Sequence, residues 1–389
     1  MKKNNASPIN GWVYFDNAAT TQVLPSAAQA ALKCMIENFA NPSSLHKFGL
    51  LSESVAKSAR KTLASILSCQ PNEIIFTPSA TVSTNIALLG SLNFKKLSKI
   101  GRTKILTTKI EHAATRNCLK QLQQQGFEVL EVEPKGFIYS EQNFENLIDE
   151  TVCMISLMHV NNENGLILPV ERIAKICKLK NKNALIHLDC VQSFTKLPIN
   201  LSNIPADFVS ISGHKINAPK GVGALFVRQN TNLNPILFGG GQQNGLCPGT
   251  ENIPAIAGFE VAAKFHNQHM KAHLEHFCSL QNKLIEICSQ FKTISFNFEK
   301  NFNLPSICNL SVNGVRSQVM LNFLESRGFL VSSGSACSKG KAGFVLTNLG
   351  YGSKRQDCSI RISFSFQNSI EEVEELAHTI GKGLRLISN

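Results

Sequence analysis

The chain has 389 residues, of which 43% are hydrophobic, and a formal net charge of +12 at pH 7. The apolar content argues against wholesale disorder, and the length exceeds that of one ordinary hydrophobic core, which predicts two or three domains. Residues 1–10 include two lysines but no apolar stretch, and no run approaches the roughly 18 apolar residues of a membrane span. We therefore expect a cytoplasmic protein with neither a signal peptide nor a membrane anchor.

The twelve cysteines are spread along the chain, without a Cys-x-x-Cys pair and without histidines clustered beside them. This spacing argues against a zinc site, and residence in the cytosol argues against disulfides, so we expect no bound metal. Most of the cysteines stand among apolar residues and are expected to be inert parts of the core. These are Cys34, Cys69, Cys118, Cys153 and Cys177.

The basic residues are dispersed and are not interleaved with aromatic residues. We therefore expect no DNA partner. The positive charge is compatible instead with an anionic cofactor or with an acidic protein partner.

Helical patterns alternate with short β-branched runs from about residue 20 to residue 265. Short apolar strands separated by amphipathic helices predict a mostly parallel sheet that is covered by helices on both faces. In such sheets, ligands bind at the carboxyl ends of the strands. The predicted strands are residues 73–76, 104–107, 151–157, 184–188, 208–212 and 223–227.

A second pattern follows a helical region, one long helix or two in succession, over residues 252–290. Three strands alternate there with three helices, which predicts a smaller α+β domain. We therefore expect an α/β protein with a large domain over 21–262, a small domain over 263–389, and a segment 1–20 that packs with the small domain. The segments of the small domain are 307–312, 316–327, 329–332, 344–349, 359–364 and 370–387.

Two strand ends carry a lysine and an aspartate that together indicate pyridoxal phosphate chemistry. Asp189 and Gln192 follow one predicted strand, and Lys215 follows the next in the run Ser-Gly-His-Lys. A pyridoxal phosphate site needs a lysine that forms a Schiff base and an aspartate that pairs with the pyridinium nitrogen. Most lysines are solvated surface charges, so the interpretation depends on the pairing of the two segments.

Other polar residues also close predicted strands. Ala80 and Thr81 open an apolar helix, where free backbone N–H groups can cradle a phosphate; an ordinary helix cap is the alternative. His112 can stack on an aromatic cofactor and relay protons, although a lone histidine is usually structural. The Asn162 amide can bond a cofactor or substrate oxygen, or it can shape a polar turn.

Two residues of the small domain have the chemistry of a nucleophile and of an anion-binding group. Cys337 lies among small residues that can hardly bury it, and Lys339 and Lys341 favour its thiolate form; an exposed inert thiol is the alternative. The planar fork of Arg361 suits an amino-acid carboxylate, and a structural ion pair is the competing interpretation. Thr250 adds a hydroxyl donor after a glycine run, although such runs more often mark plain turns.

Together these segments resemble the cysteine desulfurases, pyridoxal phosphate enzymes of the class V aminotransferase family. The resemblance runs from residue 14 to the C-terminal helix and implies the aspartate aminotransferase-like fold and a homodimer. It implies removal of sulfur from L-cysteine for iron–sulfur clusters or other sulfur-containing cofactors. The motifs are Tyr-Phe-Asp-Asn-Ala-Ala-Thr-Thr at 14–21, Asn-Pro-Ser-Ser at 41–44, Glu-His at 111–112, Asn-Asn-Glu at 161–163, Ser-Gly-His-Lys at 212–215 and Ser-Gly-Ser-Ala-Cys at 333–337.

The resemblance also implies which residues hold the cofactor. Lys215 would bind it covalently and then move the α-proton of the substrate, while Asp189 would keep the ring nitrogen protonated. Gln192 would bond the phenolate oxygen, and His112 would stack on the ring. The groups expected around the phosphate are Ala80, Thr81, Ser212, His214 and, from a partner subunit, Thr250.

The same resemblance implies how the substrate is held and attacked. Arg361, together with Asn41 and Asn162, would bind the carboxylate of L-cysteine. Cys337 would attack the substrate sulfur, leaving alanine and a persulfide, which is a reversible state of cysteine suited to a sulfur carrier. An acidic sulfur-acceptor or scaffold protein would then receive the sulfur.

The sequence departs from the family pattern in two loops. Pro78, Ser79 and Val82 replace the usual residues of the phosphate loop, and Cys247 stands where the family usually carries an arginine. The alternative functions are another lyase or transaminase of this fold, for instance one acting on selenocysteine, and a divergent paralogue with little turnover.

Overall fold

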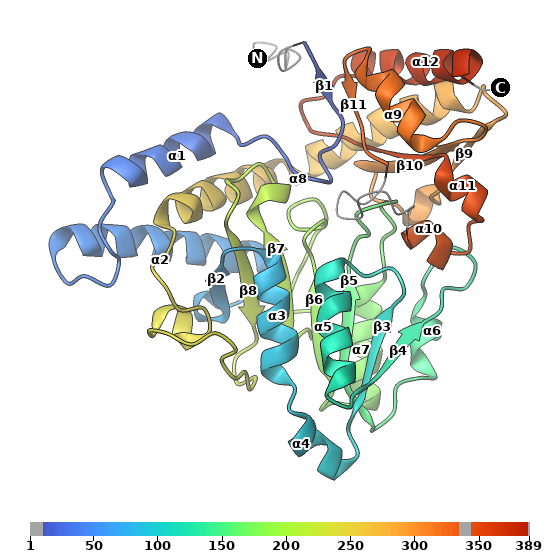
Figure 1. The fold of residues 1–389 in the computed structure, drawn as a ribbon. Coiled ribbons are helices and arrows are strands. Elements are labelled where there is room, and N and C mark those ends of the chain that lie inside the picture. Colours follow the sequence, from blue (N-terminus) through green and yellow to red (C-terminus); the bar gives the residue numbers. More distant parts are fainter. Residues whose placement is uncertain (1–10, 334–343, 388–389) are drawn as a thin grey trace.

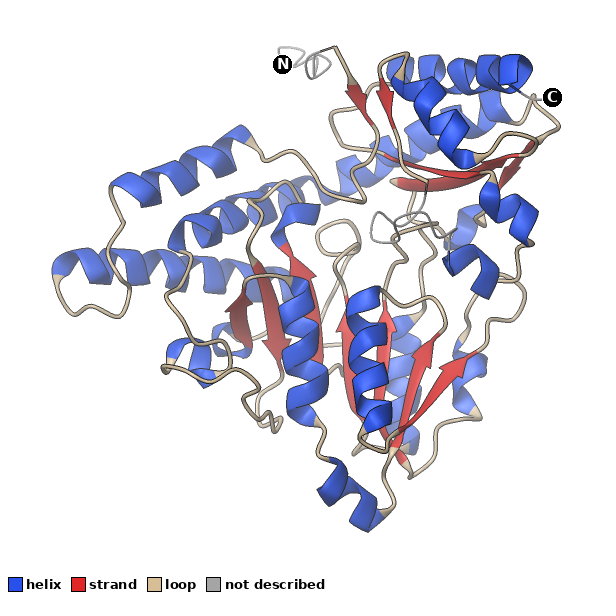
Figure 2. Ribbon diagram, viewed as in Figure 1, coloured by secondary structure: helices blue, strands red, loops and turns tan. Residues whose placement is uncertain are grey.

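A computed structural model describes residues 11–333 and 344–387 (Figure 1). A large domain is built on one broad sheet, and a smaller domain lies against the edge at which most of the strands end (Figure 2). Among the described residues, no helix is both long enough and apolar enough to cross a membrane.

The large sheet has seven strands in the order β2-β8-β7-β6-β5-β3-β4. Strand β8 runs antiparallel to β2 and β7, and the other pairs are parallel, so the mostly parallel sheet is confirmed. The bounds are β2 Ile74–Thr77, β3 Lys104–Thr108, β4 Glu128–Val132, β5 Val152–Met158, β6 Leu185–Asp189, β7 Phe208–Ser212 and β8 Gly223–Val227.

Helices cover both faces of this sheet, as the nearly continuous apolar strands require. Buried residues of α3 and α5 form one core with the sheet, and buried residues of α2, α7 and α8 form another core on the opposite face. The bounds in the large domain are α1 Pro25–Ile36, α2 Lys47–Leu67, α3 Ala80–Ser91, α4 Phe94–Leu97, α5 Ala113–Gln124, α6 Glu141–Glu145 and α7 Val170–Lys180.

The small domain contains a three-stranded antiparallel sheet in the order β12-β10-β9 and a separate parallel pair, β1 with β11. Phe15 belongs to the core of this domain, and Val13–Tyr14 pair with Phe329–Leu330, so this part of the N-terminal segment packs here. The bounds are β1 Val13–Tyr14, β9 Ile294–Phe296, β10 Ile307–Val312, α9 Ser317–Glu325, β11 Phe329–Leu330, α10 Phe344–Asn348, α11 Ser353–Asp357, β12 Ser359–Ser363 and α12 Ile370–Ile387.

One continuous helix, α8 (Ile253–Cys288), joins the two domains. Asn252 caps it by accepting a hydrogen bond from Ala255 N at 3.1 Å. Buried residues within 253–263 belong to the large core, and buried residues within 277–288 belong to the small one. The domain boundary that we expect after residue 262 therefore falls inside an unbroken helix.

Three strands, β1, β4 and β9, have no counterpart in the sequence-based prediction. Strand β1 has only two residues, and β4 and β9 lie at sheet edges, where an exposed side removes the continuous apolar run that marks a buried strand. Glu128 and Glu131 of β4 are exposed to solvent.

Gly165 lies where the two domains meet, and its carbonyl accepts a hydrogen bond from Leu304 N at 2.8 Å. Its φ is +77°, and a Cβ added there would contact the Asn303 amide and lie 2.7 Å from Ile307 O. We expect Gly165→Ala to lower the free energy of unfolding by about 2–5 kcal/mol, because left-handed strain and overpacking add.

Gly136→Ala is the matched control, since Gly136 has φ +67° and nothing within 4 Å of an added Cβ. Its free energy of unfolding should fall only by the cost of the left-handed backbone conformation, about 1–2 kcal/mol. Urea unfolding of both variants measures the difference. Equal losses of unfolding free energy in the two variants would show that the close contact of an added Cβ at residue 165 does not destabilise the protein.

Candidate active site

Polar residues at the carboxyl ends of the parallel strands converge beneath the small domain. Asp189 is the last residue of β6, and it pairs in register with Ser210 of the neighbouring β7. Lys215 ends η3 (Gly213–Lys215), the short 3-10 turn that follows β7 directly. The adjacency of β6 and β7 thus brings together the lysine and the aspartate that the sequence pairs.

The amine of Lys215 is held by the N-terminal segment. Its Nζ donates to Ala18 O at 2.6 Å and to Ala19 O at 2.7 Å. Burial and the charge of Arg361 lower the pKa of Lys215 to about 7, although Asp189 opposes this shift. A substantial fraction of the amine is therefore neutral near pH 7, so it can act as a nucleophile or a base.

The buried Asp189 and the half-buried His112 lie close to each other beside this lysine. Asp189 Oδ1 accepts a hydrogen bond from Val191 N at 3.0 Å. Burial raises the pKa of Asp189, and the charge of His112 opposes that rise. His112 caps α5 by accepting from Ala114 N at 3.2 Å. Burial lowers the pKa of His112, which favours a neutral ring.

The start of α3 has the geometry of an anion cradle. Ser79 caps the helix, and its Oγ accepts from Val82 N at 3.3 Å, so Ala80 and Thr81 open the first turn. A Cβ added at Gly223 of β8 would lie 3.0 Å from Ala80 N, so only glycine allows this close approach. Free N–H groups at a helix start favour an anion.

The other residues expected around the phosphate surround this edge. Ser212 is buried at the end of β7. His214 Nδ1 lies 3.2 Å from Thr20 Oγ1, and burial lowers the pKa of His214 to about 4. Thr250 is exposed, and it shares a cavity of about 190 Å³ with Pro78 and Cys247 of the same chain.

Arg361 is fully buried in β12, with 1% of its surface exposed. Its Nη2 forms an ion pair with Asp16 Oδ1 at 2.6 Å, and its Nη1 donates to Asn162 O at 2.9 Å. Its Nε has no hydrogen-bond partner among the described residues. The segment that leads to the expected nucleophile is anchored here, because Ser332 N donates to Arg361 O at 3.1 Å.

Gln192 and Asn41, which we expect to bind the cofactor and the substrate, make other contacts in the single chain. Gln192 Nε2 donates to Ala18 O at 2.9 Å, so the N-terminal segment occupies part of its amide. Asn41 is exposed in the connection between α1 and α2, and its Oδ1 accepts from Ser43 N at 2.9 Å. In Figure 1 this connection lies on the other side of the molecule from the small domain. Cys337 lies outside the described residues.

Three charged residues that the structure places in this region have no role in the sequence-based prediction. Asp16 pairs with Arg361, and Lys196 lies close enough to Lys215 to help lower the pKa of that lysine. The Oε1 atom of Glu111 accepts from Thr108 Oγ1 and Met158 N, and burial raises the pKa of Glu111 to about 8. Asp16 and Glu111 belong to the motifs at 14–21 and 111–112, which was the available signal, whereas Lys196 belongs to none of the motifs.

Comparisons with known proteins identify the family of this chain. Residues 13–376 match the family model described as Aminotransferase class-V. A cysteine desulfurase of Nostoc sp. is 33% identical over 384 residues, covering 97% of this chain and 94% of the relative. A Bacillus subtilis protein described as putative cysteine desulfurase IscS 1 is 36% identical over 371 residues, and the alignment covers 94% of this chain and 96% of the relative. A solved NifS-like protein superposes with a TM-score of 0.90 at 32% identity, covering 97% of this chain and 100% of that chain.

A half-buried lysine beside a buried aspartate, at the carboxyl edge of a mostly parallel sheet, is the arrangement that a pyridoxal phosphate enzyme needs. The chain belongs to the class-V aminotransferase family, and within it resembles cysteine desulfurases over nearly its whole length.

The residues present fit the family's cofactor, pyridoxal phosphate. Lys215 supplies an amine with a lowered pKa, and Asp189 supplies a buried carboxylate for the ring nitrogen. The start of α3, approached closely by Gly223, supplies backbone donors for the phosphate. When bound, the cofactor accepts the electrons that leave the substrate's α-carbon.

We expect Asp189→Asn to move the pKa of Lys215 below about 7, because the carboxylate stabilises the nearby ammonium. Trace acetylation of cofactor-free protein across a pH series, read by mass spectrometry at Lys215, measures this pKa. The control is Asp149→Asn, which removes a surface carboxylate paired with Lys104 at 2.7 Å. An unchanged or raised pKa in Asp189→Asn would contradict the assignment.

Proposed function

We infer that this protein is a cysteine desulfurase that converts L-cysteine to L-alanine and places the sulfur on its own cysteine as a persulfide. The sulfur then serves the synthesis of iron–sulfur clusters or other sulfur-containing cofactors. The pairing of Lys215 with Asp189 across β6 and β7 is the observation that carries this inference. Membership of the class-V family supports it.

Lys215 is the residue that holds and moves the substrate's α-proton. Because burial brings its pKa to about 7, the amine can accept a proton from carbon and return it at neutral pH. With the cofactor bound, Asp189 would keep the proton on its ring nitrogen. His112, a neutral ring fixed by its bond from Ala114 N, would stack on the cofactor.

Arg361 binds the substrate carboxylate, aided by Asn162 and Asn41. The ion pair with Asp16 already occupies Nη2, so the substrate must share the guanidinium with Asp16 or displace it. The buried Nε, which has no partner among the described residues, is the donor available for this purpose. The pairing keeps the buried charge neutralised before substrate arrives.

Cys337 is the sulfur acceptor within the protein. Its thiolate, favoured by Lys339 and Lys341, attacks the substrate sulfur. The carbon–sulfur bond breaks, a sulfur–sulfur bond forms, and the carbon receives a proton. Sulfur is oxidised as carbon is reduced, so the step needs no external redox partner. By contrast, burial raises the pKa of Cys153 and Cys177 to about 12 and keeps those thiols inert.

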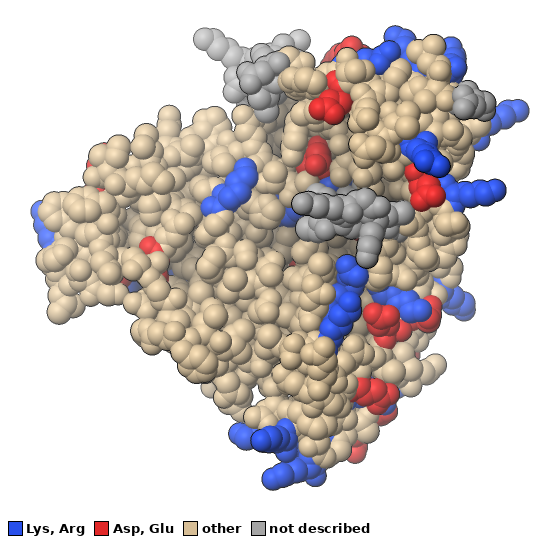
Figure 3. Space-filling model, viewed as in Figure 1, with Lys and Arg blue, Asp and Glu red and all other residues tan. Residues whose placement is uncertain are grey.

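A homodimer completes the proposed enzyme. Large apolar side chains are exposed along the first two helices and the loop that carries Thr250, and Figure 3 shows few charges over α1 and α2. A second copy of the chain would cover this surface, and Thr250 would reach the phosphate of the partner. The exposed residues include Leu32, Met35, Ile36, Phe39, Phe48 and Phe238.

The positive charge of the protein supports an acidic sulfur-acceptor or scaffold partner in the cytoplasm. Such a partner would approach the persulfide in the small domain.

With pyridoxal phosphate bound, we expect visible cofactor absorbance and release of alanine from L-cysteine, with sulfide when a reductant is present. Lys215→Ala should lose alanine formation by at least about 100-fold, because the proton-transferring base is gone. Cys337→Ser should keep the absorbance and lose the persulfide. Absorbance, alanine and sulfide are measured on each protein.

Cys278→Ser, at a partly exposed cysteine of α8, is the matched control and should behave as wild type. Wild-type protein without cofactor absorbance would sink the enzyme proposal. Undiminished activity in Cys337→Ser would leave a lyase, such as one acting on selenocysteine. Absorbance without product would indicate an inactive paralogue.

Phe39→Glu is expected to shift the protein towards monomer, because it places a charge in the proposed dimer surface. Phe39 is 70% exposed in the single chain. Sedimentation velocity measures the change. Leu179→Glu, at a residue of α7 that is 85% exposed, should leave the dimer intact. A monomeric wild type, or a dimer that Phe39→Glu leaves unchanged, would exclude this surface.

A further inference from the structure

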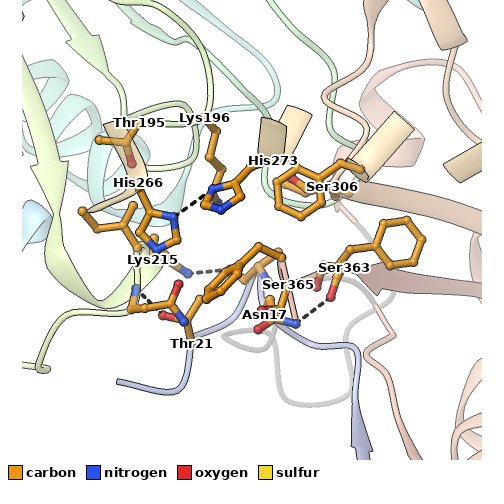
Figure 4. A pocket seen from close by; sticks show the side chains of 17 residues that line it. Asn17, Thr21, Thr195, Lys196, Lys215, His266, His273, Ser306, Ser363 and Ser365 are labelled. Carbon is orange, nitrogen blue, oxygen red and sulfur yellow. Dashed lines mark hydrogen bonds between the residues drawn. The ribbon is translucent and has the colours of Figure 1, made fainter. Parts of the chain in front are cut away.

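A second cavity, of about 30 Å³, adjoins Lys215 (Figure 4). We call it the junction cavity, because the N-terminal segment, the loop after β6, α8 and the small domain all line it. Its functional lining groups are Thr195, Lys196, Lys215, His266, His273 and Ser306.

Three buried polar groups of this lining have no hydrogen-bond partner among the described residues. They are Thr195 Oγ1, Ser306 Oγ and His266 Nε2. The three residues are 4%, 2% and 8% exposed, respectively. Buried polar atoms are nearly always paired, so three unpaired ones around one small cavity indicate a polar or charged occupant.

Lys196 adds a positive charge that the protein does not balance. Its Nζ donates to the neutral amide of Gln192 at 3.4 Å. No aspartate or glutamate of the described residues lies within ion-pair distance of Lys196. Burial lowers the pKa of Lys196 to about 8, and Lys196 in turn lowers the pKa values of Lys215 and His266. A half-buried ammonium without an ion pair in the described structure favours a counter-ion.

The backbone of Thr195, which lines the cavity, is also strained. Its φ is +57°, a left-handed conformation that β-branched residues rarely adopt. Such strain persists where the surrounding structure requires it, and it clusters at ligand-binding positions. Here it accompanies a buried hydroxyl that has no partner in the described parts of the chain.

We propose that the junction cavity binds one small monovalent anion, of the size of chloride or hydrosulfide, between Lys196 and the hydroxyls of Thr195 and Ser306. The small volume suits about two water molecules or one such ion. The anion lies beside Lys215 and balances part of the positive charge around it.

The histidines of α8 suit this occupant. His266 Nδ1 lies 3.4 Å from His273 Nδ1, so one of the two donates to the other. Burial lowers the pKa of His266 to about 3 and that of His273 to about 4, so both rings are neutral. When His273 donates, the Nε2 of His266 carries a proton, which faces the cavity and is available to an anion. Water satisfies hydroxyls equally well, but it cannot balance the charge of Lys196.

Anomalous diffraction from holoenzyme crystals soaked in sodium bromide tests the site directly. We expect a bromide peak inside the junction cavity, in contact with Lys196 Nζ. Bromide peaks on the protein surface with none in the cavity would overturn the proposal.

Thermal unfolding of the holoenzyme in sodium chloride, against sodium gluconate at equal ionic strength, tests it in solution. Gluconate is a much larger anion than chloride and serves as the reference. We expect chloride to raise the Tm of the wild type by about 2 °C or more. Lys196→Met should lose this rise, and Lys182→Met, which removes an exposed lysine, should keep it.

Thr195→Gly keeps the proposal testable if Lys196→Met does not fold, since glycine tolerates the positive φ. It should fold at least as stably as wild type in gluconate and lose part of the chloride effect. A sodium hydrosulfide series distinguishes the two sources of the anion, and only this series rests on the proposed function. No rise with either anion, or a rise retained in both variants, would overturn the proposal.

Discussion

The burial of the Lys215 amine is the constraint on which the rest of the structure depends. An ammonium taken out of water needs hydrogen-bond acceptors, and Ala18 O and Ala19 O supply them. That requirement fixes the N-terminal segment over the strand ends, where Thr21 N donates to His214 O at 3.0 Å. The segment also joins the small domain, since Asn17 Nδ2 donates to Ser363 O at 2.9 Å. One lysine thus connects three parts of the chain.

Charge balance explains much of the geometry around this lysine. Three positive groups lie close together here, namely Lys215, Lys196 and Arg361. The charges of Lys196 and Arg361 lower the pKa of Lys215. Asp189 and Asp16 oppose that effect from two sides. The two acids leave Lys196 without an ion pair in the described structure, and this imbalance distinguishes the junction cavity from an ordinary packing gap.

Much of the fold was predictable because its signals are local. The strands that became β3, β5, β6, β7 and β8 are short apolar runs buried on both faces, and their bounds agree with the predicted ones within a residue or two. The edge strand β4 escaped because Glu128 and Glu131 break its apolar pattern. Whether residues 252–290 form one helix or two stayed open in the sequence, because their apolar pattern serves two different cores in turn.

The sequence by itself determined the chemistry of this protein. Lys215 and Asp189 stand at the ends of adjacent strands, and Cys337 stands among small residues in the sequence, so local patterns were enough to predict the functional groups. Only the tertiary structure decided how the charges are paired. Asp16 meets Arg361 across 345 residues of chain, and Thr195 and Lys196 meet α8 and Ser306 at the domain junction. Such contacts depend on packing between distant segments, and no local pattern encodes them.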